Sequence, residues 1–206
     1  MSDPTVAGAI LAGGQARRFG GRDKSRLTGP DGRSIIVRQL DLLQRVTSTT
    51  FIVTTPEDRQ SRPDRFSDLA ATVAVDRIPD AGALGGVHAA LSHAATSLPG
   101  VNRVIVLACD LPFITEALLR DLATRAVHGD GAWVCGPRGA EPLIACYRVE
   151  SLERVTRALE GGERRASALG TLLTLAELGG DALAALGDPD VLTANVNTPE
   201  EWRRVQ

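Results

Sequence analysis

Aromatic side chains are scarce in this sequence, and their scarcity argues against one class of function. Phe, Trp and Tyr together make up 3% of the 206 residues, too few for a surface on which successive nucleic-acid bases stack. The formal net charge at pH 7 is −2, so the chain as a whole has no general electrostatic attraction for nucleic acid. We therefore expect no binding to DNA or RNA.

Cysteine and histidine are also rare, and long apolar runs are absent. The three cysteines include no Cys-x-x-Cys pair and the three histidines have no metal-ligand spacing, so neither a disulfide framework nor a metal cage is expected. This pattern fits a reducing compartment. No stretch is apolar for long enough to span a bilayer, and the first residues, Met1 to Pro4, lack the features of a signal peptide. We expect a cytoplasmic protein that makes no contact with a membrane.

Two common nucleotide-binding motifs are missing as well. There is no Gly-Lys-Ser/Thr, which excludes a Walker P-loop, and the glycine-rich stretch near the start lacks G-x-G-x-x-G, which argues against a dinucleotide-binding fold. In their place, an apolar run from Ala7 to Leu11 leads into a loop with two glycine pairs, Gly13-Gly14 and Gly20-Gly21. Such a run predicts a buried parallel strand whose carboxyl end opens into a ligand-binding loop.

The loop that follows this strand concentrates positive charge. Between Gln15 and Arg26 there are five basic residues and one acid, a local charge of +4: Arg17, Arg18, Arg22, Lys24 and Arg26, with Asp23. Glycine lets backbone N–H groups approach a ligand closely, and basic side chains neutralise phosphate charge. We interpret the segment as a phosphate-binding loop; the alternative is a solvated basic face.

Strands alternate with helices along the rest of the chain. Apolar runs predict strands at residues 51–55, 71–75, 103–108, 132–135, 143–147 and 191–196. Helical spacing and capping residues predict helices from Ser34 to about 46, at 87–95, from Thr115 to about 126, at 151–160, at 166–178 and after Thr198. Residues 56–65 are expected to form a loop and Gly82–Gly86 a turn. The alternation predicts an α/β protein with a mostly parallel sheet, an antiparallel element near residues 132–147, and one domain over residues 1–206.

Asp110 is the leading candidate for chemistry. It ends the most apolar strand, at residues 103–108, so it should lie at the same carboxyl edge as the glycine loop. Magnesium prefers oxygen ligands and commonly takes one or two carboxylates together with substrate phosphates. The alternative is that Asp110 only caps the following helix.

Other polar residues at strand ends are weaker candidates. Asp76 closes a strand and could accept hydrogen bonds from a guanine edge or a ribose diol, or it could be only a turn residue. Glu163-Arg164-Arg165 could hold an anion or could begin a solvated helix. Asn195 and Asn197 flank the end of the last strand, where they could orient a ligand near a metal or act only as capping groups.

The segment from Leu11 to Lys24, L-A-G-G-x-x-x-R-x-G-x-x-x-K, resembles the signature loop of nucleotidyltransferases, and most closely that of the molybdenum cofactor guanylyltransferases. The likeness runs nearly from end to end. Further matching segments are Asp76–Gly86, Ala108–Phe113, Glu141–Ala145, Gly162–Arg165 and Asn195–Glu200. Two departures stand out: Ala83 replaces a usual proline, and Thr54-Thr55 stands where some members have asparagine.

The resemblance implies an activity and a fold. Members transfer GMP from Mg-GTP to the terminal phosphate of molybdopterin carrying molybdenum and release pyrophosphate. The implied fold is a single-domain, three-layer α/β/α, Rossmann-like nucleotidyltransferase fold. The implied cofactor is Mg²⁺. The implied substrates are GTP, as co-substrate, and a molybdopterin-type small molecule. Molybdenum-insertion or acceptor proteins are candidate partners.

The resemblance also implies roles for single residues. Leu11, Ala12, Gly13 and Gly14 contact the guanosine, Arg18 and Lys24 bind phosphates, Asp76 assists guanosine binding, Asp110 binds magnesium, and Asn195 and Asn197, with Arg164 as a further candidate, face the pterin. Three other readings stay open. They are a related enzyme that uses CTP, one that acts on a sugar phosphate, and a non-catalytic nucleotide-binding regulator.

Overall fold

The computed structural model describes residues 3–13, 24–28, 32–76, 78 and 80–196. Gly14, Arg18 and Asn197, and the helix expected after Thr198, lie outside the described residues. The backbone of Lys24 is described and its side chain is not. None of the helices in these described ranges is long and apolar enough to cross a membrane.

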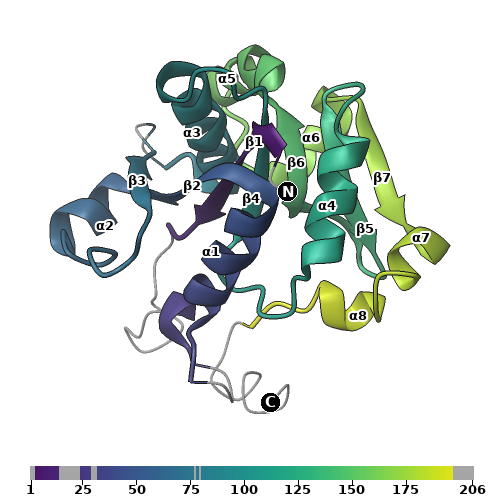
Figure 1. Ribbon diagram of the computed structural model, residues 1–206. Helices are drawn as coiled ribbons and strands as arrows, with labels where there is room; N and C mark the ends of the chain where they lie inside the picture. The colour runs from purple at the N-terminus through teal and green to yellow at the C-terminus, as the bar shows by residue number, and fades with distance from the viewer. Residues whose placement is uncertain (1–2, 14–23, 29–31, 77, 79, 197–206) are drawn as a thin grey trace.

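Seven strands form one sheet in the order β3-β2-β1-β4-β6-β5-β7 (Figure 1). The strands are β1 (Asp3–Leu11), β2 (Thr47–Thr54), β3 (Thr72–Val75), β4 (Arg103–Ala108), β5 (Gly131–Gly136), β6 (Gly139–Arg148) and β7 (Leu175–Gly179). Among these seven described strands, only the pairings of β6, with β4 and with β5, are antiparallel. The predicted α/β class, the mostly parallel sheet and the antiparallel element are therefore confirmed. The extent of the domain, residues 1–206, stays a prediction.

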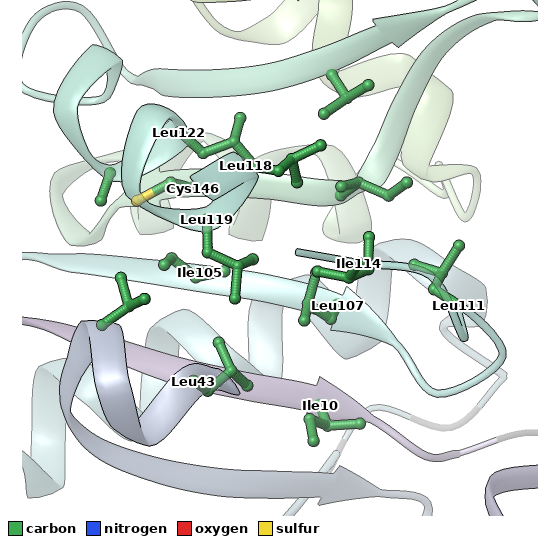
Figure 2. Packing of buried hydrophobic residues seen from close by; sticks show 14 of the residues in the cluster. Ile10, Leu43, Ile105, Leu107, Leu111, Ile114, Leu118, Leu119, Leu122 and Cys146 are labelled. Atoms are coloured by element: carbon green, nitrogen blue, oxygen red, sulfur yellow. The ribbon is translucent and has the colours of Figure 1, made fainter. Parts of the chain in front are cut away.

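Two buried clusters cover the two faces of the sheet and give three layers. On one face, Leu43 of α1 (Ile35–Val46) and Leu118 of α4 (Glu116–Arg125) pack with Ile10 and Leu107 of the central strands (Figure 2). On the other face, α3 (Gly82–Ser97) and α5 (Leu152–Glu160) pack over a second cluster. The shorter helices are α2 (Pro56–Ser61), α6 (Leu169–Leu172), α7 (Gly180–Ala184) and α8 (Pro189–Leu192), and the 3-10 turns are η2 (Lys24–Arg26), η3 (Val149–Ser151) and η4 (Ala166–Ala168).

Strand β4 shows why the sequence folds in this way. Its inner residues are large aliphatic side chains, and all of them are buried because helices cover both faces of the strand. Val104 and Val106 belong to the cluster under α3, whereas Ile105 and Leu107 belong to the cluster under α1 and α4. The predicted bounds of this strand, 103–108, are those observed.

Two predicted irregular segments are helical. Residues 56–61 form α2, whose amino end is capped by the Thr55 hydroxyl accepting from the Asp58 backbone nitrogen. The helix has no buried residue, so it carries no apolar periodicity that could have revealed it. Gly82–Gly86 is the start of α3 and not a separate turn. The glycines allow close packing, because a Cβ on Gly86 would lie 2.9 Å from Leu11 Cδ1.

The predictions for the last third of the chain are partly wrong. The helix expected at 166–178 is η4, the single turn α6 and then β7, which pairs in parallel with β5 at the edge of the sheet. The strand expected at 191–196 is the end of α8 followed by irregular backbone. Leu192 and Val196 are buried while Val191 and Asn195 are exposed. Thr193 is buried next to Leu192, so burial does not alternate along this segment as it would in a strand with one buried face.

The strand order reverses direction at β1, between β2 and β4. From β1 the chain runs through α1 to β2 and then to β3 on one side, and it returns through α3 to β4 on the other side of β1. These two helices cover opposite faces of the sheet, which makes the carboxyl ends of β1 and β4 a topological switch point. Ligands in open α/β sheets bind at this kind of position.

Candidate active site

Three of the segments singled out in the sequence meet at the carboxyl edge of the sheet. Ala12, just after β1, donates its backbone N–H to the Val53 carbonyl over 2.8 Å, and Cys109, just after β4, donates to the Leu11 carbonyl over 3.2 Å. The backbone nitrogen of Asp76 bonds to the Thr54 carbonyl over 2.9 Å. The sheet pairing therefore continues beyond the strands and aligns these chain segments side by side.

The closing motif lies beside Asp110. The backbone nitrogen of Val196 donates to the Asp110 carbonyl over 2.9 Å, which brings exposed Asn195 next to the end of β4. The Val196 side chain packs with Ile35 of α1 and with Leu27, which follows directly after the η2 turn containing Lys24. The backbone that carries Lys24, the Asp110 turn and the closing motif thus share one corner of the molecule.

Gln39 fixes the turn that carries Asp110. Its Nε2 donates to the carbonyl oxygens of Ala108 over 2.8 Å and of Leu111 over 3.0 Å, on either side of Asp110 in the chain. Gln39 lies on the buried face of α1, and its Oε1 has no hydrogen-bond partner in the part of the chain that the structure describes. The sequence analysis did not identify Gln39. The available signal was a glutamine among the apolar positions of an amphipathic helix.

A second carboxylate, that of Glu141, lies near Asp110. Burial raises the pKa of Glu141, the nearby Arg138 lowers that pKa, and the negative charge of Asp110 raises it further. Arg138 lies with its Nη2 atom 3.8 Å from Glu141 Oε1, and it also donates to the Thr193 carbonyl over 2.7 Å. Glu141 had been matched to a family motif only, without a role.

These oxygen donors suit a magnesium ion. Among the described residues, no group of three or more His, Cys, Asp or Glu side chains could hold a metal ion without other ligands. Mg²⁺ does not need such a cage, because it keeps several waters and binds one or two carboxylates together with substrate phosphates. Asp110, with Glu141 nearby, is a donor set of that kind.

Asp76 lies in a buried position beside α3. Its side chain is 6% exposed, and its Oδ1 accepts from the Ile78 backbone nitrogen over 3.0 Å. Burial raises the pKa of Asp76; the Ile78 hydrogen bond and the charge of His88 lower it, and Glu57 raises it. Ionising this carboxyl is therefore less favourable than ionising an ordinary aspartate, and hydrogen bonds donated to its ionised form would offset that cost.

Gly85 is the residue of α3 that makes room for Asp76. A Cβ there would lie 2.5 Å from Asp76 Oδ2 and 2.2 Å from Ala81 Cβ, closer than such atoms approach. We expect Gly85→Ala to lower the free energy of unfolding by about 1–3 kcal/mol, measured by urea denaturation, because the added methyl group forces the helix or the carboxylate to move. Gly161→Ala is the control, since its Cβ would approach only two carbonyl oxygens at 3.4 Å. Equal stability of both variants would contradict the close packing.

The Gly162–Arg165 segment touches the start of α3. Leu84 donates its backbone N–H to the Arg164 carbonyl over 3.3 Å. The Arg164 side chain bonds to the carbonyls of Leu159 and Glu163 over 2.7 and 2.8 Å, while hydrogen bonds from the backbone and side chain of Arg165 hold the pKa of Glu163 at about 2. The segment therefore supports the amino end of α3, which packs beside Asp76. A pterin contact for Arg164 stays a prediction.

The two threonines that replace the family asparagine have structural contacts. Thr55 caps α2. The Thr54 hydroxyl is buried and has no hydrogen-bond partner among the described residues. Gly13 packs against Thr55, where a Cβ would lie 2.9 Å from Thr55 Cγ2. This end of β2 therefore supports the start of the glycine loop.

Comparisons with known proteins agree with this geometry. A family model described as the MobA-like NTP transferase domain matches residues 8–176. A probable molybdenum cofactor guanylyltransferase of Chloroflexus aggregans is 34% identical over 206 residues, which cover 98% of this chain and 93% of that protein. A molybdenum cofactor guanylyltransferase of Desulfosudis oleivorans is 33% identical, with 98% and 94% covered.

The chain belongs to the molybdenum cofactor guanylyltransferase family. The resemblance inferred from the sequence is thereby confirmed, as is its class, a nucleotidyltransferase. A solved structure of molybdopterin-guanine dinucleotide biosynthesis protein A from Archaeoglobus fulgidus has the same fold, with a TM-score of 0.76 at 23% identity over 97% of this chain and 96% of that one. A Mycobacterium tuberculosis protein, Rv0371c, whose structure is described as a complex with manganese, has a TM-score of 0.65 at 16% identity over 98% and 97% of the two chains.

Proposed function

We propose that this family member transfers GMP from Mg-GTP to the terminal phosphate of molybdopterin that carries molybdenum. The observation that carries the proposal is the convergence at the ends of β1 and β4. There the Asp110 turn, held by Gln39, meets Val196 of the closing motif and the backbone next to Lys24. A crevice at this position of a parallel sheet is where such a fold holds a nucleotide.

The charge of the substrates decides what the protein must do. The attacking group is a phosphate monoester, whose second pKa is near 6, so it is largely dianionic at neutral pH and needs no general base. A phosphate oxygen of the pterin forms a bond to the α-phosphorus of GTP, and the bond from that phosphorus to the bridging oxygen breaks and releases pyrophosphate. The obstacle is repulsion between two anions. Rate enhancement therefore comes from positioning and from positive charge.

The chain supplies these effects from several elements. Asp110, with Glu141 nearby, would hold Mg²⁺, which when bound neutralises phosphate charge. Arg18 and Lys24 of the basic loop would bind the GTP phosphates, as the family motif implies. Asp76 would accept from the guanine edge, and Leu11, Ala12, Gly13 and Gly14 would line the guanosine. Asn195, Asn197 and Arg164 would face the pterin. Molybdenum-insertion and acceptor proteins stay predicted partners.

The test is a pyrophosphate-release assay with purified protein, GTP and molybdopterin. We expect release that requires both substrates and magnesium and that stops when a chelator removes the metal. CTP in place of GTP is the comparison that separates the guanylyltransferase from a cytidylyl-transferring relative. Pyrophosphate release with CTP but not with GTP would contradict the base assignment. Nucleotide binding without pyrophosphate release would favour the non-catalytic regulator.

A further inference from the structure

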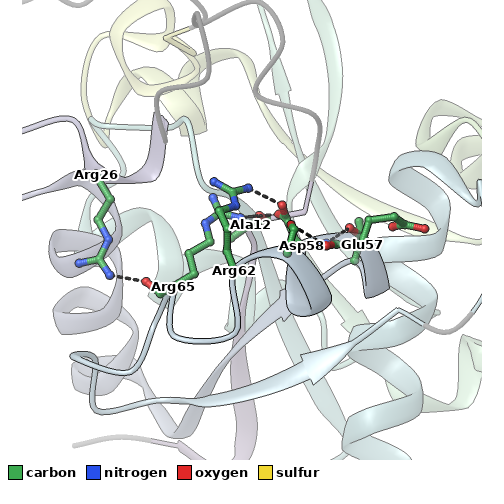
Figure 3. A network of polar contacts seen from close by, with 8 residues as sticks. Ala12, Arg26, Glu57, Asp58, Arg62 and Arg65 are labelled. Atoms are coloured by element: carbon green, nitrogen blue, oxygen red, sulfur yellow. Dashed lines mark hydrogen bonds and ion pairs between the residues drawn. The ribbon is translucent and has the colours of Figure 1, made fainter.

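Both described ends of the basic loop meet one short segment, residues 62–68, which follows α2. The first end is Ala12, whose N–H is bound by β2 and whose carbonyl oxygen accepts from Arg65 Nη1 over 2.7 Å. The second end is η2, where Arg26 Nη2 donates to the Arg65 carbonyl over 2.5 Å (Figure 3). Arg26 also pairs with the Asp68 carboxylate at 2.5 and 2.6 Å. Arg65 thus contacts one end of the loop with its side chain and the other with its backbone.

The Arg65 side chain is held firmly. It is 9% exposed, it pairs with the Asp58 carboxylate at 2.5 Å, and its guanidinium carbon lies 4.6 Å from the centre of the Phe66 ring. A buried guanidinium is tolerated when a carboxylate and hydrogen-bond acceptors satisfy it, and breaking such a set is costly. With its charge paired with Asp58 and its side chain buried, Arg65 is poorly placed to contact GTP phosphates in solvent.

We propose that Arg65 is a positioning residue for the nucleotide, and that it acts by fixing where the basic loop leaves β1 and where it returns. The proposal rests on the function given above, in which this loop binds GTP. A loop closed between two fixed ends has fewer arrangements to lose when the ligand binds, so its affinity is higher than that of a loop with a free end. Arg65 is therefore expected to affect GTP affinity without touching GTP.

Arg62 provides a matched control. It pairs with the same carboxylate, Asp58, but among the described residues it has no hydrogen bond to Ala12 or η2. Replacing either arginine by methionine keeps an apolar stem and leaves Asp58 with one guanidinium. Only Arg65→Met frees the Ala12 carbonyl.

The experiment compares Arg65→Met, Arg65→Lys and Arg62→Met with the wild type. It measures GTP affinity by calorimetry without the pterin substrate, KM and kcat, and hydrogen exchange of the peptide that contains Ala12 and Gly13. For Arg65→Met we expect a GTP dissociation constant and KM about tenfold higher, kcat within about threefold of the wild type, and faster exchange. Lysine should restore part of the affinity, because it can donate to one acceptor, and Arg62→Met should stay within about twofold of the wild type.

Hydrogen exchange and GTP affinity together distinguish a failure of the Arg65 proposal from a failure of the proposed function. Unchanged exchange at Ala12 and Gly13 in Arg65→Met, or equal GTP affinity in the two methionine variants, would overturn the positioning role. A wild type that binds no GTP would overturn the proposed function and, with it, the nucleotide role of Arg65. If Arg65→Met does not fold, Arg26→Met is the second variant. It removes the contact between η2 and the Arg65 carbonyl, and the protein should tolerate it because the Arg26 side chain is 32% exposed. Wild-type GTP affinity in Arg26→Met would refute the proposal.

Discussion

Asp110→Asn is expected to lower the rate of GMP transfer by roughly 10²- to 10³-fold at saturating GTP, the size seen when one preorganised electrostatic contact to a transition state is lost. Asparagine keeps the shape of the side chain but removes the charge that would hold magnesium against the phosphates. The backbone carbonyl of Asp110, which accepts from Val196, is unchanged by the substitution, and so are the two carbonyls that Gln39 binds. The turn should therefore keep its structure while its chemistry is lost.

Steady-state kinetics and metal titration together check this expectation. GTP affinity should fall less than turnover, and the concentration of magnesium or manganese needed for half-maximal activity should rise. Asp121→Asn is the control, because it makes the same chemical change in a carboxylate of α4 that pairs with Arg125 on the helix surface. Wild-type turnover and metal dependence in Asp110→Asn would remove Asp110 from the mechanism.

The parts of the fold that sequence predicted best are those where packing acts on both faces. Residues 103–108 are predicted to the residue, since only a central strand buries such a run of aliphatic side chains. Edge strand β7 lacks that signature because two of its five residues are exposed, and only Leu178 is fully buried. In the same way, α2 has no buried residue, and α8 is four residues long. Short elements at the surface carry too little periodicity to be identified.

The residues of the candidate site also fall into two groups, those that the sequence could predict and those that it could not. Asp110 and Asp76 could be predicted because parallel strands bring their carboxyl ends to one edge, so that position in the sequence implies position in space. Gln39 and Arg65 could not, since each acts on backbone carbonyls that lie 69 and 53 positions away in the chain. A carbonyl oxygen is the same for every residue type, so the sequence carries no mark of which carbonyl a side chain will bind. Such supporting contacts have to be found in the structure.

Asp76→Asn is expected to raise the GTP dissociation constant roughly tenfold to a hundredfold, the loss that follows when a charged hydrogen-bond acceptor is removed. Asparagine offers one oxygen, which can still accept from the Ile78 backbone nitrogen, but its amide nitrogen cannot accept from the guanine N1–H and amino group. The comparison is with CTP, whose pyrimidine edge presents different donors. The preference for GTP over CTP should shrink in the variant.

The same substitution should not destabilise the protein at neutral pH. Burial raises the folded-state pKa of Asp76 above that of the unfolded chain, so the folded protein binds the proton more tightly. The ionised carboxylate therefore reduces stability above the folded pKa, and protonation adds stability as the pH falls through that value. Because the variant carries no charge, its free energy of unfolding at neutral pH should equal or exceed that of the wild type, and the difference should shrink on acidification.

Affinity and stability should thus move in opposite directions, which separates a ligand-binding carboxylate from a turn residue. Wild-type GTP affinity should fall as the pH drops toward the raised pKa of Asp76, and this dependence should be weaker in Asp76→Asn. Burial lowers the pKa of His88 and the charge of Asp76 raises it, so Asp76→Asn lowers the His88 pKa further. A second pair, His88→Gln and His88→Gln with Asp76→Asn, therefore removes the histidine titration from the comparison. A variant that is less stable at neutral pH and binds GTP as the wild type does would show that Asp76 serves only the turn at Ile78. The base preference of the enzyme would then have to come from the backbone of the glycine loop.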